Sequence, residues 1–255
     1  MKLVGFSQLN NELEKGNLLN WLKSMEICDF LYIYDQNSTD GSREVYSQHD
    51  NVRVIYSPNN DFLNEIRCKS LLLQLLLTEN PDADWIFWMD GDTILERNLL
   101  NRNYIDIILN EYSKLEIDGI NLGHYNLWRS DLYYRVDSDY DWLHNHGVTA
   151  FWRNNGNLSF PKRKGLHSQQ FPDGISSIAR LNGSLIHKGF STDNQIITRY
   201  KNYKDRGQNG WDLDRLIDEN NLKTHRLENE KIPSWYVVKD ILDPIEKDKI
   251  HLKIQ

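Results

Sequence analysis

Short β-rich runs alternate with longer helical patterns through the first hundred residues, and no other property of the sequence narrows the fold as much. The β-rich runs span 3–7, 30–34, 52–56 and 85–89. The helical patterns span 17–27, the stretch from the turn at 36–42 toward 48, and 65–77. This order is typical of a mainly parallel sheet covered by helices. The sequence therefore predicts an α/β fold with a mainly parallel central sheet flanked by helices.

Regularity fades in the second half of the chain. A helix is expected over 104–115 and a strand over 119–127, and 128–174 is expected to be irregular. Long connections of this kind often carry substrate contacts. Two more helices are expected over 192–203 and 212–219. With 255 residues, 39% of them hydrophobic, the chain is predicted to form one domain over 1–255.

Charge and cysteine content exclude several classes of protein. The 37 acidic and 30 basic side chains give a net charge of -7, which argues against a broad nucleic-acid-binding surface. Cys28 and Cys68 form no CxxC pair, so we expect buried free thiols rather than a disulfide framework or a thiolate zinc site.

The expected location follows from the lack of long apolar segments. The amino terminus turns polar at Ser7, too early for a signal peptide. The longest apolar run, 71–77, falls far short of the roughly 20 residues of a membrane helix. We expect a soluble, cytoplasmic protein of a bacterium or of a virus-infected host cell. The tail at 236–255 mixes lysines with acids, so a peripheral membrane contact stays open there while a simple electrostatic anchor is disfavoured.

Two carboxylates follow the fourth β-rich run, in Asp90-Gly91-Asp92. Carboxylate oxygens suit Mg²⁺ or Mn²⁺, which keep coordination positions for phosphate groups. The carboxyl end of the sheet is also where open α/β folds bind ligands. The sequence thus predicts a divalent cation bridging a diphosphate to the protein, with an ordinary Asp-Gly turn as the alternative.

Asp35 ends the second β-rich run in the same way and leads into a polar turn. A carboxylate at that edge can accept hydrogen bonds from a ribose or a base. The alternative role for Asp35 is to stabilise the turn.

Three motifs together resemble a known family. They are Asn11-Glu12 after the first run, Asp35 through Ser42 after the second, and Trp85 through Asp92 at the fourth. Their order and spacing are similar to the nucleotide-sugar half of glycosyltransferases with the GT-A (Rossmann-like) fold, most closely the family 2-like group. The resemblance implies that Asn11, Glu12, Asp35, Asp90 and Gly91 contact the donor. The chain departs from the family pattern at Gln36, where the family commonly has a second acid, and the resemblance weakens after residue 130.

The segment His187-Lys188-Gly189-Phe190 resembles the part of related enzymes that supplies a third metal ligand. Asp90, Asp92 and His187 are therefore the candidate ligands of Mn²⁺ or Mg²⁺. A capping or packing role at the end of the 184–186 run is the alternative for His187.

Arg67 and Lys69 lie two apart on a predicted helix, so at most one of them should reach the ligand. We choose Arg67 as a phosphate contact, with an ion-paired helix face as the alternative.

Inversion at the sugar would require a carboxylate base. The candidates are Asp137 and, second, Asp131, both of which stand near arginines and could instead form surface ion pairs. Aromatic residues nearby could stack on a sugar ring in an irregular acceptor-side region: Trp128, Tyr133, Tyr134, Trp142 and Trp152.

The resemblance implies a metal-dependent glycosyltransferase that moves a sugar from a UDP- or GDP-linked donor to a glycan or other hydroxyl acceptor, with inversion. Residues 1–100 would bind the nucleotide sugar, 101–235 would bind the acceptor and complete the metal site, and 236–255 would form a tail. A nucleotidyltransferase of related fold, or a non-catalytic sugar- or partner-binding protein, are the alternatives. The first of these normally needs a glycine-rich basic loop after the first strand, where this chain is acidic.

Overall fold

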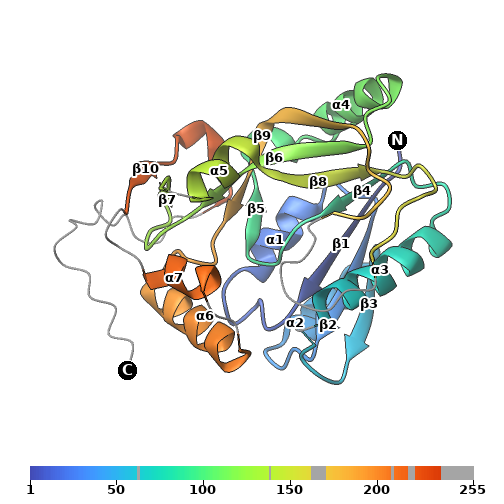
Figure 1. The fold of residues 1–255 in the computed structure, drawn as a ribbon. Helices are drawn as coiled ribbons and strands as arrows, with labels where there is room; N and C mark the ends of the chain where they lie inside the picture. Colours follow the sequence, from blue (N-terminus) through green and yellow to red (C-terminus); the bar gives the residue numbers. More distant parts are fainter. Residues whose placement is uncertain (62–63, 138, 162–170, 208–209, 218–221, 237–255) are drawn as a thin grey trace.

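An eight-stranded sheet forms the centre of the protein. The computed structural model describes residues 1–61, 64–137, 139–161, 171–207, 210–217 and 222–236. The strand order is β3-β2-β1-β4-β8-β6-β9-β5 (Figure 1). The strands are β1 (Leu3–Leu9), β2 (Phe30–Gln36), β3 (Val52–Ser57), β4 (Trp85–Trp88), β5 (Thr93–Leu95), β6 (Gly119–Asn126), β8 (Val148–Arg153) and β9 (Ile178–His187). A two-stranded sheet joins β7 (Tyr133–Arg135) to β10 (Thr224–Arg226).

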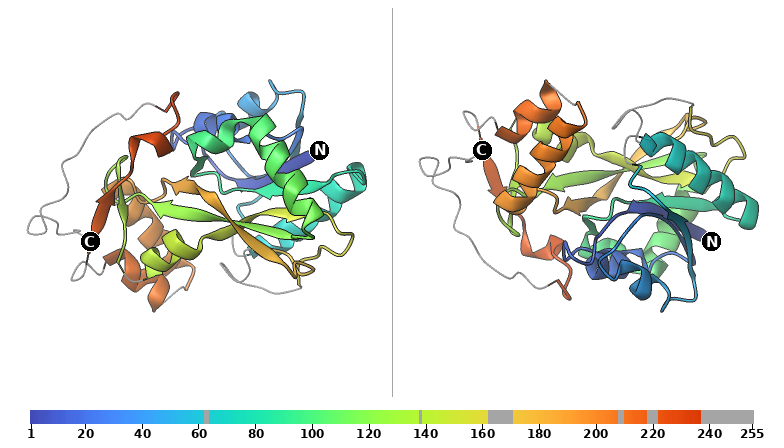
Figure 2. Two further views of the ribbon diagram at one scale, coloured as in Figure 1. Left: turned by 90° about the horizontal axis from the view of Figure 1, so that it is seen from above. Right: turned by 90° about the horizontal axis from the view of Figure 1, so that it is seen from below.

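Helices lie on both sides of the sheet, as Figure 2 shows. They are α1 (Leu18–Met25), α2 (Ser42–Tyr46), α3 (Glu65–Glu79), α4 (Arg102–Lys114), α5 (Asp139–His146), α6 (Asp193–Asp205) and α7 (Trp211–Ile217). The expected α/β fold with a central sheet flanked by helices is confirmed.

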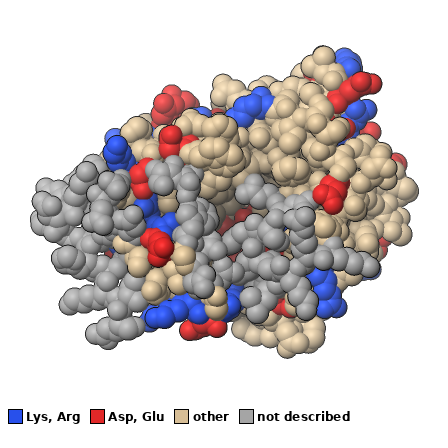
Figure 3. All heavy atoms as spheres, viewed as in Figure 1, with Lys and Arg blue, Asp and Glu red and all other residues tan. Residues whose placement is uncertain are grey.

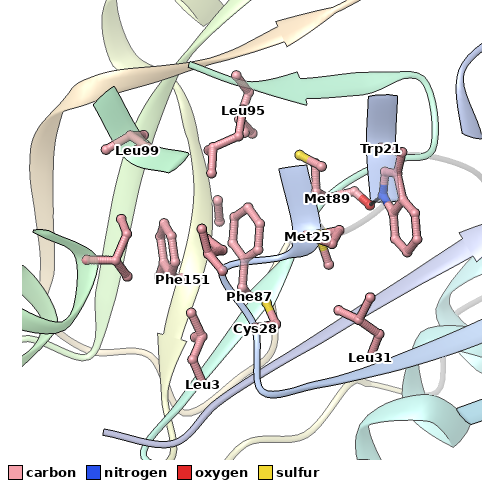
Figure 4. Close-up of a cluster of buried hydrophobic side chains, with 14 of the residues drawn as sticks. Leu3, Trp21, Met25, Cys28, Leu31, Phe87, Met89, Leu95, Leu99 and Phe151 are labelled. Carbon is pink, nitrogen blue, oxygen red and sulfur yellow. Dashed lines mark hydrogen bonds between the residues drawn. The ribbon is translucent and has the colours of Figure 1, made fainter. Parts of the chain in front are cut away.

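Alternating side chains on the buried strands build two cores. Leu3 and Phe87 belong to one cluster with Trp21 of α1 (Figure 4). Leu109 of α4 is part of the same cluster. Val4, Phe6, Ile86 and Trp88 pack with the leucines of α3 in the other cluster. Successive strand residues point to opposite faces, so these strands are apolar throughout because both faces are covered. Cys28 and Cys68 are buried and free, as expected.

The region 128–174 is more regular than the sequence suggested. It contains β7, α5 and β8, and β8 pairs antiparallel with both β4 and β6. Four of the seven pairings in the large sheet are parallel and three antiparallel, so the sheet is mixed in its second half. The strand β8 is buried on both faces except at its last residue, so it lacks the alternating pattern that marks a strand in sequence.

No helix within the described ranges has the length and apolar character needed to cross a bilayer. The tail, for which a peripheral membrane contact was left open, falls almost wholly on 237–255, outside the described residues, and the cellular location stays a prediction.

The stack of Phe151 on Phe87, with ring centroids 4.4 Å apart, predicts how much β8 contributes to stability. Phe151→Ala should lower the free energy of unfolding by about 3–5 kcal/mol, because it leaves a cavity in a fully buried core. Phe30→Ala, at a ring that is 43% exposed, is the control and should cost about 1 kcal/mol or less. Urea unfolding measures both; equal losses would contradict the central position of β8.

Candidate active site

A cleft of about 760 Å³ opens at the carboxyl ends of β1 and β4. One wall comes from the segments after these strands and from the start of α3, and the other from the end of β9 and from α6. Figure 3 shows, in the same view as Figure 1, basic side chains gathered along the lower edge of the molecule, over the position of α6. The cleft thus joins the amino-terminal half of the chain to a helix more than a hundred residues away.

The loop after β4 carries Asp90, Gly91 and Asp92 into this cleft. Its start is fixed because the Met89 carbonyl accepts hydrogen bonds from Ser7 Oγ at 2.7 Å and from Trp21 Nε1 at 3.3 Å. A Cβ atom on Gly91 would come within 2.6 Å of a Leu9 methyl group and 2.9 Å of Glu12 Cγ. Glycine is therefore required for the close packing of this loop against the segment after β1.

Strand register brings His187 beside Asp92. β5 pairs antiparallel with β9 so that Thr93 lies opposite His187, and Lys188 N–H donates to the Asp92 carbonyl at 2.8 Å. The buried His187 ring then places Nε2 3.3 Å from Asp92 Oδ2. The structure thus brings together Asp90, Asp92 and His187, the three candidate metal ligands.

Asp92 is surrounded by positive charge. Arg199 Nη2, from α6, donates to Asp92 Oδ2 at 2.5 Å. Burial alone would raise the pKa of Asp92, but His187 and Arg199 outweigh it and hold that pKa well below its usual value.

Asp90 has the opposite environment. The side chain is open to the cleft, yet loss of hydration between the walls and the nearby Asp92 charge raise its pKa from 3.8 to about 6, with Lys69 opposing the shift. Of the two carboxylates in this loop, Asp90 therefore keeps its proton to a higher pH than Asp92.

Asn11 and Glu12, after β1, also line the cleft. Asn11 has a left-handed backbone, φ 52°, and its Oδ1 accepts from Thr39 N–H at 2.8 Å. The Glu12 carboxylate accepts from Lys15 Nζ at 2.8 Å and from Asn17 Nδ2 at 2.9 Å. Burial raises the pKa of Glu12, and Lys15 partly offsets that rise. Asn17 thus braces Glu12 and makes no side-chain cap on α1.

Asp35 does not reach the cleft lining. It is fully buried, and its Oδ1 accepts from Ser38 N–H at 2.9 Å and from Arg43 Nε at 3.1 Å. These bonds match the turn-stabilising alternative. The other oxygen, Oδ2, is buried and finds no hydrogen-bond partner among the residues that the structure describes.

Lys69, rather than Arg67, faces the cleft. Arg67 is exposed and absent from the lining, whereas Lys69 is 2% exposed and lines it. The Lys69 ammonium pairs with Glu65 and lies 4.1 Å from the centre of the Trp88 ring. Lys69 is therefore the one of the two that lies at the cleft, whereas Arg67, the predicted phosphate contact, lies on the exposed side of α3.

The two candidate bases lie outside the cleft lining. Asp137 is buried and accepts from Arg135 Nε at 2.8 and 3.0 Å. Asp131 accepts from Tyr236 Oη at 2.8 Å and lies 3.9 Å from Lys188 Nζ. Both carboxylates are engaged in ion pairs, but Asp137 is buried rather than on the surface and the cation near Asp131 is Lys188 rather than an arginine. Neither lies in the cleft lining, where it could take a proton from an acceptor.

Sequence reasoning missed the contribution of α6. Gln195, Arg199, Asn202 and Arg206 all line the cleft and recur at helical spacing. The start of α6 carries a capping box in which Thr192 Oγ1 accepts from Gln195 N–H at 3.2 Å. The Thr-x-x-Gln pattern and the polar stripe after it were the available signals.

Comparisons with known proteins add little to this geometry. The sequence matches no protein-family model and none of the curated proteins compared with it. One solved structure that it resembles is a mannose-1-phosphate geranyltransferase from Thermus thermophilus, with a TM-score of 0.38 and 11% sequence identity. The match covers 60% of this chain and 56% of that one, so this chain spans little more than half of its length. A likeness this low carries no statement about function.

The contrast between Asp90 and Asp92 predicts opposite effects of two matched substitutions. With EDTA at pH 7, Asp90→Asn should raise the midpoint of thermal unfolding. The folded-state pKa of about 6 lies above 3.8, so ionised Asp90 destabilises the fold above pH 6, and this penalty vanishes below about pH 3.8.

Asp92→Asn should lower the same midpoint at pH 7. The depressed pKa of Asp92 means that its stabilising effect is present above its ordinary pKa and is lost only as pH falls through the lower folded value. Calorimetry from pH 4 to pH 7 measures both variants; shifts of the same sign at pH 7 would contradict the assignment.

Proposed function

We propose that this protein is a metal-dependent glycosyltransferase that moves a sugar from a UDP- or GDP-linked donor to a glycan or another hydroxyl acceptor. The observation that supports it is the meeting of Asp90, Asp92 and His187 in one cleft at the carboxyl edge of the parallel strands. That edge is where open α/β folds bind nucleotides.

The donor set suits Mn²⁺ or Mg²⁺ in its chemistry. Among the described residues no three His, Cys, Asp or Glu side chains are already arranged around a common point. These ions are commonly held by one or two carboxylates together with substrate phosphates, so a closed protein cage is not needed. Asp90, Asp92 and His187 would hold the cation, which would supply positive charge to a leaving diphosphate.

Cationic side chains in the cleft support the same chemistry. As the bond between sugar and diphosphate breaks, negative charge grows on the leaving group, and fixed positive charges stabilise it. Lys15, Lys69 and Arg199 line the cleft around the Asp90–Asp92 loop. Asn194, Gln195 and Asn202 on α6 supply amides suited to hydroxyl groups. Inversion at the sugar stays a prediction from the family resemblance.

The segment after β1 favours sugar transfer over nucleotidyl transfer. It brings Glu12 and Glu14 to the cleft with a single cation, Lys15. A glycine-rich basic loop would be expected there if the enzyme bound the triphosphate of a nucleotide substrate.

Turnover of nucleotide sugars tests the proposal directly. Wild-type protein with Mn²⁺ and a panel of UDP- and GDP-sugars should release the nucleoside diphosphate, faster when a hydroxyl acceptor is present. Asp92→Ala should abolish this release while circular dichroism shows an intact fold. Pyrophosphate release from a nucleoside triphosphate and a sugar phosphate would instead indicate a nucleotidyltransferase, and donor binding without product would indicate a binding protein.

Lys69 and Arg67 form a matched pair two positions apart on α3. Lys69→Met should weaken UDP binding about tenfold, because it removes one charge-assisted contact to phosphate from the cleft. Arg67→Met should leave binding unchanged, since its side chain is exposed outside the cleft. Isothermal titration measures both; equal losses would contradict the role given to Lys69.

A further inference from the structure

The Asp92–Arg199 ion pair spans the cleft from the loop after β4 to α6. Arg199 Nη2 lies 2.5 Å from Asp92 Oδ2, and the same oxygen lies 3.3 Å from His187 Nε2. The carboxylate that the proposed function assigns to a divalent cation therefore already has a cationic partner from this chain.

Several contacts place Arg199 there. The capping box at Thr192 fixes the start of α6, and the Arg199 guanidinium lies 4.8 Å from the centre of the Phe190 ring. Gly189 closes the cluster, since a Cβ atom there would collide with both Arg199 and Asp92. The Arg199 side chain is nevertheless 26% exposed and lines the cleft, so it can move toward a ligand without unfolding α6.

A divalent cation and this guanidinium cannot share one carboxylate oxygen favourably. Two positive charges about 4 Å apart repel strongly where the surroundings are partly buried. Binding of the cation alone must therefore displace Arg199 and leave it without its carboxylate. A diphosphate in the same cleft would remove that cost, because its oxygens are strong acceptors for a guanidinium.

We propose that Arg199 is the resident counter-ion of Asp92, that it competes with the divalent cation for this carboxylate, and that it turns to the diphosphate when cation and nucleotide bind together. This inference rests on the proposed function and extends it. Its consequence is reciprocal coupling: cation and diphosphate each raise the affinity of the site for the other, and part of that coupling comes from Arg199.

The test compares Mn²⁺ binding, read from the electron paramagnetic resonance of free Mn²⁺, with and without inorganic pyrophosphate. Without pyrophosphate, Arg199→Gln should bind Mn²⁺ about tenfold more tightly than wild type. Lys201→Gln is the matched control, because it removes one exposed charge of α6 outside the cleft lining, and it should keep the wild-type affinity. Pyrophosphate should strengthen Mn²⁺ binding about tenfold or more in wild type and clearly less in Arg199→Gln.

A second substitution, Arg199→Lys, tests the same proposal in case Arg199→Gln does not fold. Arg199→Lys keeps a charge on α6 but loses the forked geometry, so it should also bind Mn²⁺ alone more tightly than wild type, by a smaller factor. Circular dichroism checks that each variant is folded.

The proposal is overturned if folded Arg199→Gln and Arg199→Lys bind Mn²⁺ no more tightly than wild type. It is also overturned if Asp92→Asn keeps the wild-type Mn²⁺ affinity, or if pyrophosphate helps Arg199→Gln as much as wild type. These measurements involve no sugar. If they come out as expected while no nucleotide sugar is turned over, the counter-ion role stands and the proposed function fails.

Discussion

The short antiparallel pairing of β5 with β9 is the constraint on which the site depends. It sets Thr93 opposite His187 and lets Lys188 N–H bond to the Asp92 carbonyl. Because α6 begins only a few residues beyond β9, the same pairing carries Arg199 to the cleft. The chain thereby joins an acidic loop of its first half to an imidazole and a guanidinium of its second half, which local sequence alone could not bring together.

That pairing also explains the electrostatic contrast inside one loop. Asp92 faces His187 and Arg199, which hold its pKa down, whereas Asp90 faces a second carboxylate with Lys69 as its opposing charge. A site that keeps two like charges close together is not optimised for stability, and such sites are retained where a ligand or cation completes them. The arrangement therefore supports a functional rather than a purely structural role for the loop.

Residues beside the cleft form its supporting wall. The Arg135 guanidinium packs against both Trp128 and Tyr140, 4.4 and 4.6 Å from the two ring centres. It donates to Asp137 at 2.8 Å and to the Arg215 carbonyl of α7 at 2.6 Å. Asp137 is thus part of a buried framework under α6 and α7. Trp128 and Tyr140 belong to a buried apolar cluster with Phe190, Ile196 and Leu216, so these two aromatic residues serve packing and lie outside the cleft lining.

The sequence by itself predicted β1 to β4, α1 to α3 and the loop with Asp90 and Asp92, but it did not predict β5, and His187 followed only from the family resemblance. It could predict β1 to β4 because buried parallel strands are marked by apolar runs and their carboxyl ends meet at one edge. Only the tertiary structure decided that β8 enters the sheet, that Lys69 and not Arg67 faces the cleft, that Asp35 turns inward, and that Arg199 reaches Asp92. The first three depend on which face of an element its neighbours cover, and the Arg199–Asp92 contact joins residues more than a hundred positions apart; local periodicity encodes neither.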